Sequence, residues 1–327
     1  MRMTRLSTVV TIFTLMALIP LLLLIRIVVG KDTSILMWIL KAVPSGLYFL
    51  LVYLVGYWGF FFYNLRYLFG ILYVGATAWS VTKIVGLPFL LGNDFSEVLR
   101  HNGFSFTMYI IASGVLIYFI VKAIKARTFD EAPVLLTFPF KKGKYYVMEG
   151  GDSKEFRLVN YHYSGSLHKG NNVHRSMRYA TDIVKLNSLG CYASGVFPVK
   201  AEKYIIFHEA LLSPCDGTVI AVVDDLENEE PFSGKHPYNV GNHVVLRMDG
   251  VHVVMGHMQK GSILVQVGDA VHTGQKIALV GNSGLTEFPH LHIQAMKAGD
   301  FPIWEGAGVP ILFDGAFLVK NHIVSKT

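Results

Sequence analysis

Long apolar runs, which few charges interrupt, dominate the first 127 residues. Four runs stand out, at residues 7–29, 35–63, 67–87 and 106–123. A helix needs about 20 apolar residues to cross the hydrocarbon core of a bilayer. The pattern therefore predicts an α-helical transmembrane region of about four spans over residues 1–127.

The first run begins like a signal peptide but does not end like one. Met1–Arg5 carries the charge of an n-region, yet the apolar run exceeds the length of an h-region, about 7–15 residues, and no small-residue cleavage site follows. We therefore predict a retained anchor. Lys41, in the second run, is a charge at membrane depth, which can mark function. Its place near the start of the run favours a side chain that reaches the interface.

Near Val134 the pattern changes, because the apolar runs shorten and turn residues multiply. Seven short segments bounded by Gly, Pro, Asp and Asn are predicted as strands, namely Tyr145–Met148, Thr218–Val223, His243–Met248, Val251–Met255, Ile263–Val267, Lys276–Val280 and His290–Ala295. No periodic helix separates them. Residues 128–327 are therefore predicted as an all-β domain, a sandwich or a barrel.

Composition and charge support this division. Hydrophobic residues make up 52% of the chain and charged residues 16%, which excludes both a uniform soluble globule and a disordered chain. Residues 1–127 hold 11 Lys and Arg against 3 Asp and Glu, and residues 128–327 hold 18 against 20. A basic surplus in the apolar part indicates a membrane and not nucleic acid.

Two further counts concern compartment and orientation. The only cysteines, Cys191 and Cys215, exclude a disulfide scaffold and a Cys-rich zinc module, and whether they pair stays open. Four spans would place both chain ends on one side, where six flanking Lys and Arg lie against four on the other side. By the positive-inside rule, this count favours a cytoplasmic C-terminal domain.

The candidate chemistry lies in His290-Leu291-His292. In a strand, residues i and i+2 point to one face, so both imidazoles project together while Leu291 and Ile293 face the other side, where the core is expected. Two imidazoles on one face suit a zinc ligand beside a catalytic base. The alternative is a buried, hydrogen-bonded pair.

The context of this pair contains several motifs in a fixed order. They are Arg178-Tyr179-Ala180-Thr181-Asp182, Gly256-His257-Met258, Val267-Gly268-Asp269-Ala270-Val271, Gly281-Asn282-Ser283-Gly284 and Pro289-His290-Leu291-His292. Over about residues 145–296 this series resembles the lysostaphin-type zinc endopeptidases, which cut peptide cross-links in bacterial cell walls. The resemblance does not extend to residues 1–127.

The resemblance implies a fold, a cofactor and a division of roles. The β domain would have a lysostaphin-like antiparallel sheet of the barrel or sandwich type and would bind one Zn²⁺. Asp182 and His292 would be zinc ligands, and His257 and His290 would be catalytic. A catalytic zinc keeps three protein ligands and one open position. Substrate-binding residues are not assigned.

One departure concerns the third ligand. The family places a His four residues before the Asp, where this chain has Arg178, which stays protonated and cannot bind zinc. The replacement candidates are His162, His168 and His174. We predict His162, which lies in an aromatic stretch suited to a strand beside the site, whereas the other two lie in a segment predicted to be an exposed loop. A site without a third protein ligand is the remaining alternative.

The sequence thus predicts a membrane-anchored zinc metalloendopeptidase that acts on peptidoglycan or a similar peptide. One alternative is a degenerate relative that only binds the cell wall or a partner, which the Arg178 departure favours. Another is a non-enzymatic adaptor of the biotinyl or lipoyl type, which shares the Val-Gly-Asp hairpin. Such an adaptor needs an exposed Lys flanked by Met at a hairpin tip, and none is evident in this sequence. The implied substrate lies outside the cytoplasm, so we expect an extracytoplasmic C-terminal domain despite the charge count. The cleaved bond and any protein partner stay open.

Overall fold

The computed structural model describes residues 5–90, 94–163, 173–233, 240–299 and 303–327. Contacts within the chain divide it into two compact units. The helical unit consists of Ser7–Trp58 and Asn64–Ile124, and the β unit consists chiefly of Gly59–Tyr63 and Lys125–Thr327. The predicted division into residues 1–127 and 128–327 did not anticipate that a segment from the N-terminal part belongs to the β unit.

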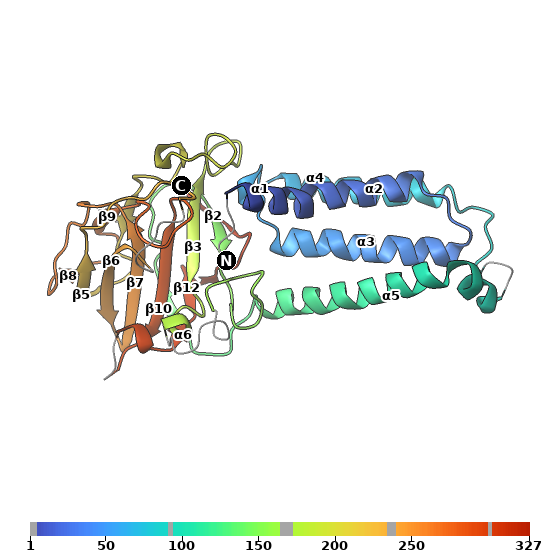
Figure 1. Cartoon of the computed structure of the whole chain (residues 1–327). Coiled ribbons are helices and arrows are strands. Elements are labelled where there is room, and N and C mark those ends of the chain that lie inside the picture. The colour runs from blue at the N-terminus through green and yellow to red at the C-terminus, as the bar shows by residue number, and fades with distance from the viewer. Residues whose placement is uncertain (1–4, 91–93, 164–172, 234–239, 300–302) are drawn as a thin grey trace. The chain divides into compact units, whose positions relative to one another are not determined.

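Apolar helices make up the helical unit (Figure 1). They are α1 (Arg5–Phe13), the π-helical turn η1 (Thr14–Leu18), α2 (Ile19–Val29), α3 (Ile35–Val55), α4 (Leu65–Val81) and α5 (Phe95–Lys125). Within the described residues, three continuous helices are long and apolar enough to cross a membrane, namely Leu6–Val29, Ile35–Val55 and Phe95–Lys125. Helix α4 has 17 residues and a length of about 26 Å, against about 30 Å of hydrocarbon. The membrane-type region is therefore confirmed, while the count of four spans stays a prediction.

The second apolar run is shorter as a helix than the sequence predicted. Helix α3 begins after Ser34, whose hydroxyl accepts a hydrogen bond from the Met37 amide, and it ends before Gly56. The rest of the run is irregular except for the 3₁₀ turn η2 (Trp58–Phe60). Within the helix, buried Lys41 Nζ lies 2.5 Å from Oδ2 of the partly buried Asp32. An adjacent carboxylate therefore compensates this charge.

One large antiparallel sheet organises the β unit, in the order β14-β2-β3-β10-β7-β6-β5-β8, with β11 paired to β10 (Figure 1). Its strands are β2 (Gly143–Glu149), β3 (Thr181–Leu186), β5 (Gly217–Val223), β6 (Asn242–Met248), β7 (Val251–Met258), β8 (Ala270–Val271), β10 (Leu291–Lys297), β11 (Gly308–Val309) and β14 (Ile323–Lys326). Smaller sheets join β1 (Val134–Leu136), β12 (Ile311–Phe313) and β13 (Ala316–Phe317), and β4 (Ala210–Leu212) with β9 (Lys276–Leu279). The β-rich class with antiparallel sheets is confirmed.

The main sheet separates a hydrophobic core from the face that carries the predicted chemistry. Leu291 and Ile293 of β10 and Ile183 of β3 are fully buried in the core. Because side chains alternate along a strand, Asp182 and His292 point to the opposite face. The prediction that Leu291 and Ile293 face the core is confirmed.

Several local predictions were wrong or incomplete, and besides β3 the short strands β1, β4, β8, β11, β12, β13 and β14 were not predicted. Ile263–Val267 forms no strand, and its Leu264 and Val267 are exposed. Strand β3 was not predicted, although it carries Asp182. The four-residue helix α6 (Val173–Ser176) lies where an exposed loop was expected. The thiols of Cys191 and Cys215 are both free, and Cys215 is buried.

Candidate metal centre

Three predicted ligands meet on the polar face of the sheet. His162, Asp182 and His292 each offer one ligand atom, and these atoms lie within 4.8 Å of one another. His162 Nε2 lies 3.3 Å from Asp182 Oδ2, and His292 Nδ1 lies 3.0 Å from Asp182 Oδ1. The strand register explains the second contact, because Asp182 and His292 are directly opposite each other on β3 and β10. His162 comes from an irregular segment, not from the predicted strand.

The second ring nitrogen of each histidine is held by a side-chain amide. His162 Nδ1 donates to Asn160 Oδ1 at 2.7 Å, and His292 Nε2 donates to Gln294 Oε1 at 2.9 Å. Asn160 in turn donates to the carbonyls of Gly151 and Ala180, both at 2.8 Å. Metal-bound histidines characteristically donate their other N–H in this way, which fixes the tautomer and the ring orientation. His162 Nε2, His292 Nδ1 and the Asp182 carboxylate form an N₂O donor set that fits zinc.

A β-bulge brings His257 to the same site. Asn242 pairs with Met258 and Val244 with Met255, so two residues of β7, Gly256 and His257, oppose one residue of β6. In a regular ladder His257 would face away, since its neighbour Gly256 is the residue opposite His292. The bulge and a left-handed backbone at His257, with φ of 61°, turn the ring back. Such a backbone is costly for a residue other than glycine and is concentrated at functional sites.

The four histidines of the site form a compact group. The His257 ring centre lies 4.7 Å from that of His290 and 5.7 Å from that of His292, and the rings of His162 and His292 are 4.9 Å apart. His290 immediately precedes β10, and its Nε2 lies 3.5 Å from Asp182 Oδ1. Asp182 and the four histidine side chains are all buried. The structure thus brings together all five residues that the sequence singled out.

The two histidines outside the ligand set have opposite protonation preferences. His257 Nδ1 donates to the Ser283 carbonyl at 2.8 Å. Burial, followed by the nearby His290 and His292, holds the pKa of His257 well below its usual value, which favours the neutral ring. Burial also lowers the pKa of His290, but the Asp182 carboxylate outweighs it and raises this pKa overall. A neutral ring can accept a proton and a protonated ring can donate one, so the pair is suited to acid–base work.

A buried ion pair lies beside the carboxylate ligand. Glu149 of β2 is the register partner of Asp182, and its Oε1 accepts a hydrogen bond from Lys320 Nζ at 2.8 Å. Both side chains are buried. Lys320 compensates the negative charge of Glu149. The Asp182 carboxylate is therefore the negative group that would face a cation bound at the site. Removing one partner of such a pair is strongly destabilising, by about 3–5 kcal/mol.

Arg178, which stands where the resemblance implies a ligand, forms ion pairs with three carboxylates. Its guanidinium bonds Asp152 Oδ2 at 2.6 Å, Asp130 Oδ1 at 3.0 Å and Glu131 Oε1 at 3.1 Å. It therefore joins the start of the β unit to the segment before β3. Of the other ligand candidates, His168 lies outside the described residues, and so does the side chain of His174 in α6.

Asn160 and Gln294 hold the rings of two predicted ligands, and the sequence analysis assigned neither of them a role. Each lies two positions from a predicted ligand, as Asn160-Tyr161-His162 and His292-Ile293-Gln294. On β10 this spacing places Gln294 on the face of His292. An amide side chain two residues from a candidate ligand was therefore the available signal.

Aromatic side chains pack around the segment that leads into His290. The Phe288 ring lies 5.7 Å from the ring of His290, and the Phe60 ring lies 5.5 Å from that of Phe288. Phe60 also stacks on Phe197 at 4.6 Å and meets Tyr192 edge-on at 5.3 Å. The backbone amide of Tyr63 donates to the Gly190 carbonyl at 3.1 Å. The segment Gly59–Tyr63 is thus built into the β unit close to the candidate site.

We expect Gln294→Leu to weaken zinc binding by about 10–100-fold, the usual loss when an outer-shell partner of a metal ligand is removed. The leucine keeps much of the side-chain volume but leaves His292 Nε2 without its acceptor. Competition with a chromophoric chelator measures the affinity. Gln266→Leu, at an exposed turn position, is the matched control. Equal affinities of Gln294→Leu and the unchanged protein would contradict the assigned role.

Comparison with known proteins finds a family match for part of the β unit. Residues 207–302 match the family described as Peptidase family M23. The match includes His257, His290 and His292 but not His162 or Asp182. Two peptidoglycan DD-endopeptidases of Vibrio cholerae are similar over short segments. ShyB is 41% identical over 78 residues, which are 21% of this chain and 18% of ShyB. ShyA is 38% identical over 64 residues, which are 20% of this chain and 14% of ShyA.

Solved structures give weaker likenesses. A zinc-containing peptidase from Vibrio cholerae shares 21% identity, covering 54% of this chain and 39% of that one, with a TM-score of 0.31. The catalytic domain of the antimicrobial peptidase lysostaphin from Staphylococcus simulans shares 21% identity, covering 36% of this chain and 85% of that one, with a TM-score of 0.24. These low TM-scores carry no conclusion about function. The chain spans less than a fifth of the length of the two curated relatives.

Proposed function

Because residues 207–302 form a domain of Peptidase family M23, we propose that this chain is a membrane-anchored zinc metalloendopeptidase that hydrolyses peptide cross-links in peptidoglycan. The observation that carries the proposal is the convergence of His162, Asp182 and His292 within 4.8 Å, flanked by His257 and His290. The names of the two curated relatives support peptidoglycan as the substrate. In this proposal residues 1–127 anchor the enzyme, and residues 128–327 hold one zinc.

The roles of the side chains follow from their hydrogen bonds. Zinc, held by His162, Asp182 and His292, would polarise the scissile carbonyl and acidify a water molecule. His257, kept neutral by burial and oriented by Ser283, accepts the proton from the attacking water at Nε2 and returns it to the leaving amine. His290, whose Nδ1 donates to the Phe288 carbonyl at 2.7 Å, presents Nε2–H to the developing oxyanion. Asn160 and Gln294 keep the ligand rings in place.

Digestion of purified sacculi by the full-length protein in detergent tests the function. We expect soluble peptide fragments to be released, new amino groups to appear, a chelator to stop the reaction and zinc to restore it. A second candidate, a catalytically inactive binding module, is favoured by the ion-paired Arg178 at a family ligand position. A protein that holds a full equivalent of zinc, binds sacculi and cuts no bond would establish that candidate instead.

The zinc content should depend on His162. We expect one zinc per chain in the full-length protein and a large loss in His162→Ala, because two ligands then remain. His174→Ala is expected to keep the ion, and elemental analysis after gel filtration measures both variants. If the double variant His162→Ala/His174→Ala held as much zinc as the unchanged protein, neither histidine would be the third ligand.

The β unit should face away from the cytoplasm, against the count of flanking charges, because peptidoglycan lies outside. Gly59–Tyr63 belongs to the same unit and must lie on the same side of the membrane. A C-terminal alkaline phosphatase fusion is expected to be active, and an insertion of the same reporter between α4 and α5 inactive. A C-terminal reporter that works only in the cytoplasm would exclude peptidoglycan as the substrate.

A further inference from the structure

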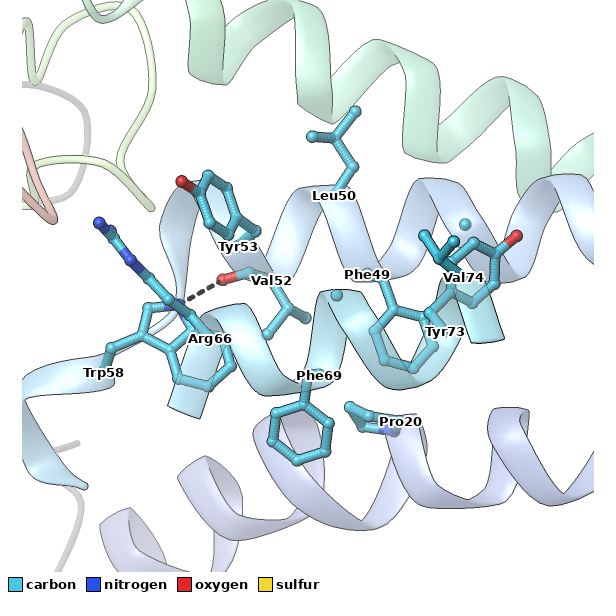
Figure 2. Close-up of a pocket in the computed structure, with 12 residues that line it drawn as sticks. Pro20, Phe49, Leu50, Val52, Tyr53, Trp58, Arg66, Phe69, Tyr73 and Val74 are labelled. Carbon is cyan, nitrogen blue, oxygen red and sulfur yellow. Dashed lines mark hydrogen bonds between the residues drawn. The ribbon is translucent and has the colours of Figure 1, made fainter. Parts of the chain in front are cut away.

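The helical unit contains a partly open pocket that residues of α2, α3, η2 and α4 line (Figure 2). Its volume is about 220 Å³, and its walls are mostly apolar, with Pro20 from α2, Phe49 and Leu50 from α3, and Phe69 from α4. An apolar cavity of about 150 Å³ already binds benzene. This pocket is therefore large enough for a segment of hydrocarbon chain.

Glycines on two helices shape the pocket in different ways. A Cβ atom at Gly46 would lie 2.6 Å from Tyr73 Oη, so the missing side chain lets Tyr73 approach and donate to the Ala42 carbonyl at 2.9 Å. Gly70 also lines the pocket, and a Cβ atom there would meet no heavy atom within 4 Å. The sequence thus leaves room at Gly70 that a larger residue would occupy.

One end of the pocket is polar and cationic. Figure 2 shows Trp58, Tyr53 and Arg66 grouped at one end and Tyr73 with Val74 at the other. The Arg66 guanidinium carbon lies 5.0 Å from the centre of the Tyr53 ring and 4.7 Å from that of Tyr67. Arg66 is the second residue of α4, where the helix dipole is positive. Trp, Tyr and Arg at one end of apolar helices are typical of the head-group level of a bilayer.

We propose that this pocket binds one anionic phospholipid, with part of an acyl chain between α3 and α4 and the phosphate at Arg66. The apolar walls match the chain, and the guanidinium with the helix N-terminus matches the phosphate in charge. Arginine is suited to this role because its planar donors fit phosphate oxygens. The bound lipid would contact α2, α3 and α4 and would stabilise their packing against one another.

Lipid binding to the full-length protein tests the proposal. The protein is delipidated in detergent and titrated with dioleoyl phosphatidylglycerol or dioleoyl phosphatidylcholine, and retained lipid is measured by extraction and mass spectrometry. Gly70→Leu should bind phosphatidylglycerol at least about tenfold more weakly, a loss of about 1.4 kcal/mol. Gly75→Leu is the matched control, since Gly75 lies on the same helix and does not line the pocket, and a Cβ atom there would also meet no heavy atom within 4 Å. It should bind like the unchanged protein.

A second pair of variants tests the phosphate contact. Arg66→Gln should lose about tenfold in affinity for phosphatidylglycerol, the loss expected for a charge-assisted hydrogen bond, and keep its affinity for phosphatidylcholine. Arg100→Gln, at an exposed position on α5, should change neither. Equal binding by Gly70→Leu and Gly75→Leu would overturn the pocket as the chain site. An unchanged lipid preference in Arg66→Gln, or displacement of the lipid by inorganic phosphate alone, would overturn the phospholipid assignment.

Discussion

His292→Ala is expected to lose its zinc and all peptidoglycan hydrolysis, whereas His290→Ala keeps the ion and loses only rate. His292 Nδ1 lies 3.0 Å from the Asp182 carboxylate, and its other nitrogen is fixed by Gln294. His290 Nε2 lies farther from the carboxylate, at 3.5 Å, and His290 Nδ1 donates a hydrogen bond to the Phe288 carbonyl. Loss of an oxyanion donor or a positioned acid costs about 10²–10⁴-fold in rate.

Zinc content and the single-turnover rate on sacculi, measured on the same preparations, separate the two effects. Zinc added in excess should leave His292→Ala inactive and leave the residual rate of His290→Ala unchanged. The opposite pattern, with zinc lost in His290→Ala and retained in His292→Ala, would reverse the two roles. Thermal unfolding of both variants without zinc checks that neither change disrupts the sheet.

Replacing His257 should lower the rate by about 10²–10⁴-fold while zinc stays bound, because its neutral ring is the base of the proposed reaction. Asparagine is a better replacement than alanine, since asparagine adopts the left-handed backbone of this position more readily. His257→Asn therefore removes the base with little effect on the fold. The rate of sacculus hydrolysis and the zinc content of His257→Asn, measured on the same preparation, check this prediction.

The matched control for this variant is His252→Ala. His252 lies on the same strand and is also buried, yet the structure gives it no contact with the three ligands. Its removal should leave the rate within a few fold of the unchanged protein. Full activity in His257→Asn would show that another group accepts the proton, and zinc loss in that variant would make His257 a ligand.

Local patterns predicted what depends on neighbouring residues alone. The apolar runs gave the helical region because hydropathy is a property of each run, and the period of two in His290-Leu291-His292 placed Ile293 in the core and His292 on the opposite face. The sequence did not show β3, because Thr181–Leu186 includes Asp182 and Lys185 among its apolar residues. That strand is defined by pairing with β2 and β10.

The positions of His257 and His162 could not be predicted either, because they also depend on residues that are distant in the sequence. His257 reaches the site only through a bulge between β6 and β7, which depends on a register shift that no motif records. The contact of His162 with Asp182 depends on an irregular segment that Asn160 anchors through two backbone carbonyls. The resemblance to a family supplied His257 as a candidate, and the pairing of β7 with β6 and β10 brings it to the site.

The segment Gly59–Tyr63 restricts how this chain can be recombined. A gene fusion that cut once before Lys125 would leave Phe60 behind, and the rings of Phe197 and Phe288 would lose an aromatic neighbour. Transfer of the whole β unit therefore needs two breakpoints or must carry α4 and α5 along. The β unit of this chain is therefore not one continuous segment that could be exchanged as a cassette.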